Sequence, residues 1–117
     1  GGGQNTNFDN SVSVDVKAMS LGAGSHILDL NRNANFKLTL SGNITLVNPA
    51  ELTAGTTGSI FIVQDGTGSR TVSYGTSWDF IGGTAPTMTT AASSVDRIDY
   101  IVLDSTNIHA VATLAYS

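Results

Sequence analysis

Short stretches in which apolar and polar residues alternate are the feature that most constrains how this chain can fold. Residues 36–40 read Phe-Lys-Leu-Thr-Leu, and residues 44–46 read Ile-Thr-Leu. A period of two places every second side chain on the same face of a β-strand. The intervening residues 41–43, Ser-Gly-Asn, have the composition of a tight turn. We therefore expect an antiparallel hairpin over residues 36–46, with an inner face formed by Phe36, Leu38, Leu40, Ile44 and Leu46.

Similar alternation indicates further strands along the chain. Residues 11–17 have valine at positions 12, 14 and 16, and we expect these valines to share the buried face of a strand. Residues 25–30 form another expected strand. A second hairpin is expected over residues 95–116, because an Asp-Ser-Thr-Asn turn at residues 104–107 separates two apolar-rich segments. The residues that share one face of its return strand are Ile108, Ala110, Ala112, Leu114 and Tyr116.

Two short runs are apolar on both faces of the expected strand, namely Ile60–Val63 and Ile101–Leu103. Such strands lie in the centre of a sheet, or one of their faces meets another subunit. About eight to ten short strands separated by turns are typical of an antiparallel β-sandwich of jelly-roll type. We therefore expect an all-β protein, with a flexible Gly- and Asn-rich arm at residues 1–10 and a single β-sandwich domain at residues 11–117.

The small number of charged residues bears on which kinds of partner the protein can bind. Charged side chains make up 12% of the 117 residues, the net charge is −4, and the five Lys and Arg residues are scattered. A chain without a basic patch cannot neutralise several phosphates, so we expect no nucleic-acid partner. The apolar runs are too short for insertion into a membrane. The first residue is glycine, and we expect the sequence to be a fragment or a processed product.

Residues 64–70, Gln-Asp-Gly-Thr-Gly-Ser-Arg, form a polar, glycine-rich segment between two apolar stretches. A phosphate-binding loop would need a Lys-Ser or Lys-Thr pair and a following helix, and neither is present in the pattern. The segment therefore predicts a hairpin turn that joins residues 60–63 to residues 71–74 as antiparallel neighbours. We expect Gly66 or Gly68 to adopt a positive φ there.

The sequence contains no pattern that is typical of a metal, cofactor or catalytic site. Asp65 is the only carboxylate in its segment, whereas calcium prefers six to eight oxygen ligands. His26 and His109 lie in separate strands, cysteine is absent, and no Gly-x-Ser-x-Gly motif occurs. We expect no cofactor, no metal and no enzymatic activity. A carboxylate pair for glycoside hydrolysis would depend on spacing in three dimensions, which the sequence does not give.

Aromatic residues cluster after the glycine-rich segment, at Tyr74, Trp78 and Phe80. Exposed rings of this kind can stack on sugars, but aromatic residues more often anchor the core of a β-sandwich. We expect Trp78 to be a core residue. The alternative, a loop surface for a ligand or receptor, would use Gln64, Asp65, Arg70, Tyr74, Trp78 and Asp79.

Residues 42–111 resemble a module of tailed-bacteriophage structural proteins. The resemblance rests on "GNITL", on "LTAGTTGSIFIVQDGTGSRTV", on "WDFIGGTAPTMT", and on "VDRIDY" followed by the turn "DSTN". Met88 stands where this pattern usually has leucine, a change that conserves volume. The resemblance implies a virion component such as a tail fibre, head fibre or surface protein, often trimeric, and it implies no reaction.

These observations together predict a non-enzymatic structural protein of the phage virion surface. It would be a capsid decoration or head-fibre protein, or a tail-fibre module. We expect self-association, as a homotrimer, and contact with a capsid or fibre shaft. The arm at residues 1–10 should lie on another chain if it is ordered, because fixing each residue costs about 1–2 kcal/mol. The alternative is a fibre-tip domain that binds a carbohydrate or host receptor.

Overall fold

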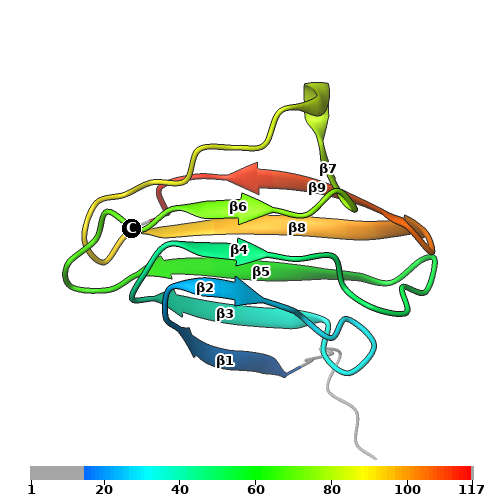
Figure 1. Ribbon diagram of the computed structural model, residues 1–117, viewed down its shortest axis with the longest axis horizontal. Helices are drawn as coiled ribbons and strands as arrows, with labels where there is room; N and C mark the ends of the chain where they lie inside the picture. The colour runs from blue at the N-terminus through cyan, green and yellow to red at the C-terminus, as the bar shows by residue number, and fades with distance from the viewer. Residues whose placement is uncertain (1–14, 117) are drawn as a thin grey trace, which may run out of the picture.

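The computed structural model of the protein describes residues 15–116, which form two β-sheets packed face to face (Figure 1). The larger sheet has six strands in the order β1-β3-β5-β8-β9-β7, and the smaller has three in the order β2-β4-β6. A 3₁₀ turn, η1, spans Ile81–Gly83. The strands are β1 Val16–Leu21, β2 Gly24–His26, β3 Asn35–Leu40, β4 Ile44–Leu46, β5 Thr57–Gln64, β6 Val72–Tyr74, β7 Trp78–Phe80, β8 Val95–Asp104 and β9 Asn107–Thr113.

The first six strands build three stacked rungs of a short solenoid. β1, β3 and β5 pair in parallel in the larger sheet, while β2, β4 and β6 pair in parallel in the smaller one. Each rung therefore consists of one strand from each sheet, joined by a corner. Equivalent residues of successive rungs lie against each other, as the register of Met19, Leu38 and Ile62 shows. Such stacking buries one continuous core, because each rung covers the apolar face of the next.

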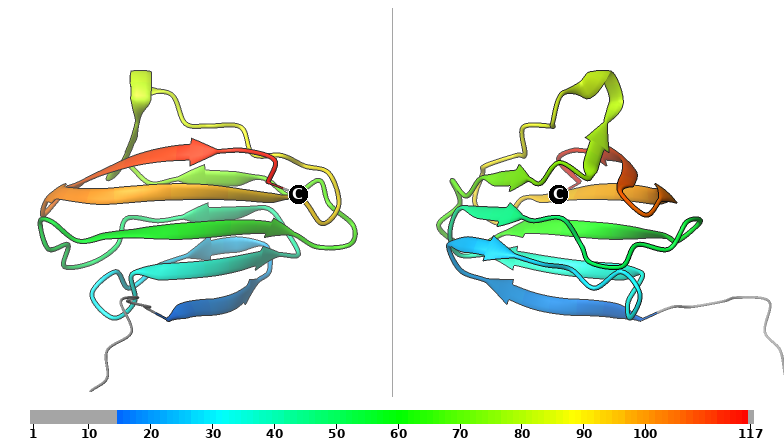
Figure 2. Two further views of the ribbon diagram at one scale, coloured as in Figure 1. Left: turned by 180° about the vertical axis from the view of Figure 1, so that it is seen from behind. Right: turned by 45° about the vertical axis from the view of Figure 1, so that its right-hand side comes forward.

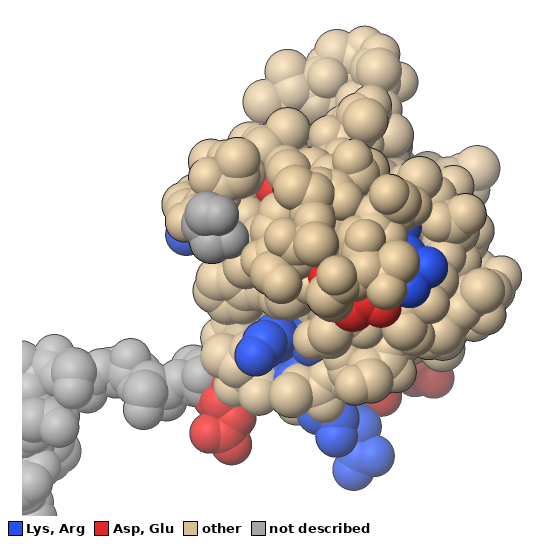
Figure 3. Space-filling model, turned by 90° about the vertical axis from the view of Figure 1, so that its left-hand side faces the viewer, with Lys and Arg blue, Asp and Glu red and all other residues tan. Residues whose placement is uncertain are grey.

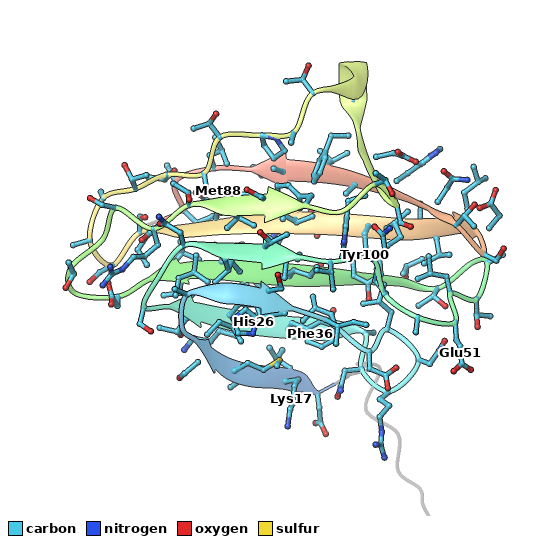
Figure 4. All side chains as sticks on the ribbon, in the orientation of Figure 1. Lys17, His26, Phe36, Glu51, Met88 and Tyr100 are labelled. Carbon is cyan, nitrogen blue, oxygen red and sulfur yellow. The ribbon has the colours of Figure 1, made fainter. Side chains whose placement is uncertain are left out.

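The core lies between the two sheets. It is built from the inward-facing residues of both, such as Leu38, Leu46 and Ile60, which are fully buried. Phe36 and Tyr100, labelled in Figure 4, are buried, whereas Lys17 lies at the lower edge of the view. The Tyr100 hydroxyl donates to the carbonyl oxygen of Ala34 at 2.7 Å, and burial raises the pKa of this phenol to about 12.

The C-terminal strands β8, β9 and β7 extend the larger sheet beyond β5. β8 pairs antiparallel with both β5 and β9, and β7 adds to β9 in parallel. The second expected hairpin is therefore confirmed, although β9 ends at Thr113 and the last two residues of the expected face, Leu114 and Tyr116, lie beyond it and are exposed. Its turn contains an Asp104 side chain that accepts from the backbone N–H of Thr106 at 2.9 Å and from the Asn107 side chain at 2.8 Å.

The long connection between η1 and β8 is fixed by one buried carboxylate. Asp96 on β8 is 1% exposed. It accepts hydrogen bonds from the backbone N–H and the hydroxyl of Thr89, at 2.6 and 2.8 Å, and from the backbone N–H of Ala115 at 2.8 Å. Met88, next to Thr89, is buried in the core (Figure 4). Asp96 therefore ties both the connection and the C-terminal segment to the sheet.

The all-β class is confirmed, but the pairing of strands differs from the expected antiparallel sandwich. Residues 36–40 and 44–46 do not form a hairpin, because β3 and β4 lie in different sheets. The expected hairpin of residues 60–63 with 71–74 is wrong for the same reason. A turn can lead to a neighbouring strand of the same sheet or to a strand of the facing sheet. The alternation of apolar and polar residues in the two strands is the same in both cases, so it does not distinguish them. The two-sheet architecture does not establish a jelly roll.

The expected faces of the strands are correct in most places. The inner residues proposed for 36–46 are all buried, and Ile60 and Ile62 are buried within the central strand β5. Val16 is an exception, because it lies on the outer face of β1 and is 48% exposed, while Leu21 faces the core. The strand expected at residues 25–30 is shorter, β2, and ends at His26. Val12, Val14 and the arm at residues 1–10 lie outside the described residues.

Candidate functional site: loop 65–71 and the outer face of the larger sheet

Loop 65–71, which contains all of the glycine-rich segment except Gln64, forms the corner between β5 and β6 and is held by hydrogen bonds among its own residues and Gln64. The buried Gln64 amide donates to the carbonyl oxygens of Arg70 and Thr89 at 2.7 and 3.1 Å, and its oxygen accepts from the Arg70 N–H at 3.0 Å. Asp65 accepts from the backbone N–H groups of Thr67 and Gly68 and pairs with the Arg70 guanidinium at 3.0 Å. The three predicted ligand residues of this loop therefore bind one another.

These contacts also define the electrostatics of the loop. The hydrogen bond from Arg70 and that from the Gly68 N–H lower the pKa of Asp65 below its usual value. A lowered pKa means that the ionised carboxylate favours the folded state above the usual pKa, and that this contribution is lost as the pH falls through the folded value. The charged groups of the loop thus hold its shape.

Gly68 is the residue that the loop geometry requires. Its φ is 74°, and a Cβ atom would lie 2.6 Å from the Thr90 carbonyl oxygen and 2.8 Å from the Ala92 nitrogen. At Gly66 a Cβ would meet no atom within 4 Å, and no positive φ occurs there. The expectation that Gly66 or Gly68 has a positive φ is therefore confirmed, and Gly68 is the glycine that has it.

We expect Gly68→Ala to lower the free energy of unfolding by about 1–3 kcal/mol, because both the backbone strain and the contact with Thr90 oppose the methyl group. The matched variant Gly66→Ala should change it by no more than about 1 kcal/mol. Chemical denaturation of both variants measures the difference. Equal stability of the two variants would show that the backbone at Gly68 is not constrained.

The aromatic cluster belongs to the core. Trp78 is 5% exposed, and its indole N–H donates to the Val47 carbonyl oxygen at 3.3 Å. Tyr74 packs edge-to-face on Phe80, with ring centroids 4.7 Å apart. Burial raises the pKa of the Tyr74 phenol, and the charge of Asp96 adds to that shift. The core role expected for Trp78 is confirmed, and the indole ring is not an exposed platform.

The outer face of the larger sheet carries an unusual number of apolar side chains. Figure 2, left, shows this face from outside. The exposed large apolar residues on it and on the C-terminal segment that follows β9 are Val16, Ile101, Leu103, Val111, Leu114 and Tyr116, between 44% and 55% exposed. Phe61, Val63 and Val95 on the same face are half-buried. Viewed along the strands, charged side chains are few and scattered (Figure 3).

The outer face of the smaller sheet is polar by contrast. Ser25, Thr45 and Ser73 form a row across β2, β4 and β6. The two outer faces therefore differ in chemistry. Apolar patches of this kind on one face of a soluble domain commonly mark an interaction site.

Two hollows occur on the outer face of the larger sheet. The apolar hollow, of about 470 Å³, is lined by Val16, Lys37, Phe61, Val63 and Val95. It lies on the N-terminal side of the sheet, over β1, β3, β5 and the start of β8. Lys37 is its single charged residue.

The acidic groove is the second hollow, of about 450 Å³, on the β7–β9 side of the same face. Asp79, Asp99 and His109 line it together with Ile81, Ile101 and Val111. Asp79 is the register partner of His109. Asp99 accepts from the Ser59 hydroxyl at 2.6 Å and pairs with Arg97 at 3.0 Å, whereas the side chains of Asp79 and His109 have no hydrogen-bond or ion-pair partner within residues 15–116.

Residues 23–107 match the family model described as "Putative phage tail fibre C-terminal domain". The chain belongs to this family. The resemblance to phage virion proteins expected from residues 42–111 is thereby confirmed. The tail fibre family is a structural one, and a tail fibre is a component of the virion. No curated protein and no solved structure matches the chain. Within residues 15–116 of this tail fibre domain, no helix is long and apolar enough to cross a membrane.

Of the six site residues predicted from the sequence, Asp79 alone lines one of the two hollows of the outer face. Gln64, Asp65 and Arg70 bind within loop 65–71, and Tyr74 and Trp78 lie in the aromatic cluster. The outer-face residues Phe61, Lys37 and His109 were not predicted as a group. The signal that could have found them is the run Ile60–Val63, which is apolar on both faces, combined with the rung repeat that aligns Lys37 with Phe61 in the tail fibre domain.

Proposed function

We propose that this tail fibre domain is a structural, non-enzymatic module that assembles with copies of itself through the outer face of the larger sheet. The observation that carries the proposal is the contrast between the two outer faces, apolar on the six-stranded sheet and a Ser-Thr-Ser row on the three-stranded one. Burial of apolar surface is the main driving force of most protein association. The family description supports a place in the tail fibre over one on the capsid.

The size of the face suits a stable interface. Six strands spaced about 4.8 Å apart, with lengths of six to ten residues at about 3.3 Å each for the central ones, give a face of roughly 25 by 20–30 Å. An interface of standard size buries about 800 Å² on each partner. The outer face is therefore large enough to supply most of such an interface without any other part of the domain.

We propose a homotrimer at the virion surface as the assembled form, in which the outer faces of the larger sheets turn toward one another. The polar faces of the smaller sheets would then be exposed to solvent. Further contacts with a fibre shaft or another virion protein would be made by other surfaces. This arrangement explains why Ile101 and Leu103 are exposed in the single chain.

The oligomeric mass tests this proposal. Sedimentation equilibrium at micromolar concentration should give three times the chain mass of 12.1 kDa, about 36 kDa, with dissociation at high dilution. A mass of 12.1 kDa across the whole concentration range would contradict self-association. A mass of twice the chain mass would retain self-association but contradict the trimer.

A second candidate function is the binding of a host-surface carbohydrate or receptor. The observation that favours it is the acidic groove, where the Asp79 and His109 side chains, which have no partner in the described part of the chain, lie beside apolar residues. Hydrogen-bonding groups next to apolar walls are typical of small-ligand sites. Titration with a panel of methyl glycosides, followed through the imidazole resonances of His109, tests it. Saturable shifts would support binding, and unchanged resonances at millimolar glycoside would count against it.

A further inference from the structure

The segment β7–η1 forms a projection at one edge of the larger sheet. It rises above β9, at the opposite edge from β1 (Figures 1 and 2). Ile81, the first residue of η1, is 80% exposed, the highest value among the exposed large apolar side chains of the described residues. Gly82 and Gly83 follow with φ of 75° and 74° and turn the chain at the tip. Asp79 lies two residues before Ile81, and its side chain has no hydrogen-bond or ion-pair partner among the described residues.

The apolar hollow has the complementary features. Its walls are Val16, Phe61, Val63 and Val95, and Lys37 is the cation on its lining. The Lys37 side chain is exposed and has no ion-pair or hydrogen-bond partner within residues 15–116. A projection with an apolar tip and a carboxylate therefore exists on one half of the outer face, and an apolar hollow with an ammonium group exists on the other half.

We propose that copies associate head to tail, with the Ile81 side chain of one copy in the apolar hollow of the next and Asp79 of the first paired with Lys37 of the second. This inference rests on the self-association proposed above and names its contact. Burial of Ile81 removes its large exposed surface from water, and the opposite charges set the relative position of the copies.

The geometry makes this contact heterologous, because the two patches are different parts of one face. Heterologous contacts produce a closed ring when the rotation between copies closes, and a trimer is one such ring. Within a single chain, Lys37 on β3 and Asp79 on β7 are separated by four strand spacings in the sheet order. That distance is about 19 Å. The two charges therefore cannot pair within one copy, and any coupling between them must act between copies.

Exchanging the charges of Asp79 and Lys37 tests the proposal, with association measured by sedimentation equilibrium. Asp79→Lys and Lys37→Asp should each weaken association about tenfold or more, because each places like charges together at the contact. The double variant Asp79→Lys/Lys37→Asp should restore association to within about threefold of the original, because the pair is re-formed with reversed sign.

The apolar part of the contact has its own matched pair of variants. Ile81→Ser should weaken association about tenfold or more, since the tip loses its buried surface. Ile27→Ser is the control, because Ile27 is 55% exposed but lies on the loop after β2, away from the larger sheet's outer face. This control should leave association unchanged. Circular dichroism of each variant checks that the fold is retained.

The outcomes separate this inference from the proposed function. A monomeric parent protein would overturn both. An assembled protein in which neither single charge variant weakens association, or in which the double variant shows no recovery, would overturn the head-to-tail contact and leave self-association in place. Loss of glycoside binding in Asp79→Lys with an unchanged mass would assign Asp79 to a ligand and would also overturn it.

Discussion

Replacement of Asp96 by alanine is expected to lower the free energy of unfolding by about 3 kcal/mol. The carboxylate is 1% exposed and accepts two hydrogen bonds from Thr89 and one from Ala115. Without it, the backbone N–H groups of Thr89 and Ala115 lose their acceptor at a partly buried position, and each such loss costs about 1–3 kcal/mol. The connection that carries Met88 and the segment after β9 should then separate from the sheet more readily.

Chemical denaturation measures this effect, with Asp15→Ala as the control. Asp15 is exposed and has no partner among the described residues, so its replacement should change stability by no more than about 0.5 kcal/mol. Hydrogen exchange should locate the increased opening at Thr89 and Ala115. A loss below about 1 kcal/mol for Asp96→Ala would show that water or another group replaces the carboxylate.

The substitution Ile101→Asp is expected to dissociate the assembled protein. Ile101 is 49% exposed on the outer face of β8, so the single chain tolerates a polar residue there, whereas an interface would bury the new carboxylate in a groove already lined by Asp79 and Asp99. Burial of an unpaired charge costs about 3 kcal/mol or more, which weakens association more than 100-fold. The matched control is Thr45→Asp on the polar face of the smaller sheet.

Sedimentation of the two variants at equal concentration gives the result. Ile101→Asp should run as a monomer that retains its β-sheet spectrum, and Thr45→Asp should keep the mass of the parent protein. Dissociation by both variants would indicate a general effect of negative charge. Assembly that survives Ile101→Asp would exclude this part of the outer face from the contact.

The sequence predicted which side chains are buried better than it predicted which strands are neighbours. Alternation correctly placed Phe36, Leu38 and Ile44 in the core, because the period of two depends only on the strand having one buried face. It could not distinguish a hairpin from a corner at residues 41–43, since both need a short polar turn. The antiparallel pair β8–β9 was predictable because its turn joins two strands of the same sheet.

An internal sequence repeat is the signal that could have predicted the parallel rungs. Val16 lies against Asn35 and Phe36 against Ile60, offsets of 19 and 24 residues. The unequal offsets weaken the repeat signal, and the connection at residues 47–56 between β4 and β5 contributes to the longer one. The glycine-rich segment does reverse the chain between two strands, but as a corner between the sheets and not as the predicted hairpin turn. Its hydrogen bonds to Thr89 and Thr90 depend on residues far along the chain and could not be predicted from the local pattern.

The candidate site was predictable only in part, because strand pairing decides which residues share the outer face. Runs that are apolar on both faces, such as Ile60–Val63, indicated that one face needs a second covering layer. Which residues from other strands share that face depends on the register across the sheet. Lys37, Phe61 and Arg97 lie in one row because β3 pairs with β5 in the parallel solenoid and β5 pairs with β8 in antiparallel orientation.

The most direct test of the account is the accessibility of the outer face in the assembled protein. The chain contains no cysteine, so a single cysteine at Val111 or at Ser73 can be alkylated without background. Val111 lies on the outer face of the larger sheet, and Ser73 on that of the smaller one. We expect Val111→Cys to react at least about tenfold more slowly in the assembled protein than after dilution to monomer, and Ser73→Cys to react equally fast in both. Equal reaction of Val111→Cys in the two states would contradict association through this face.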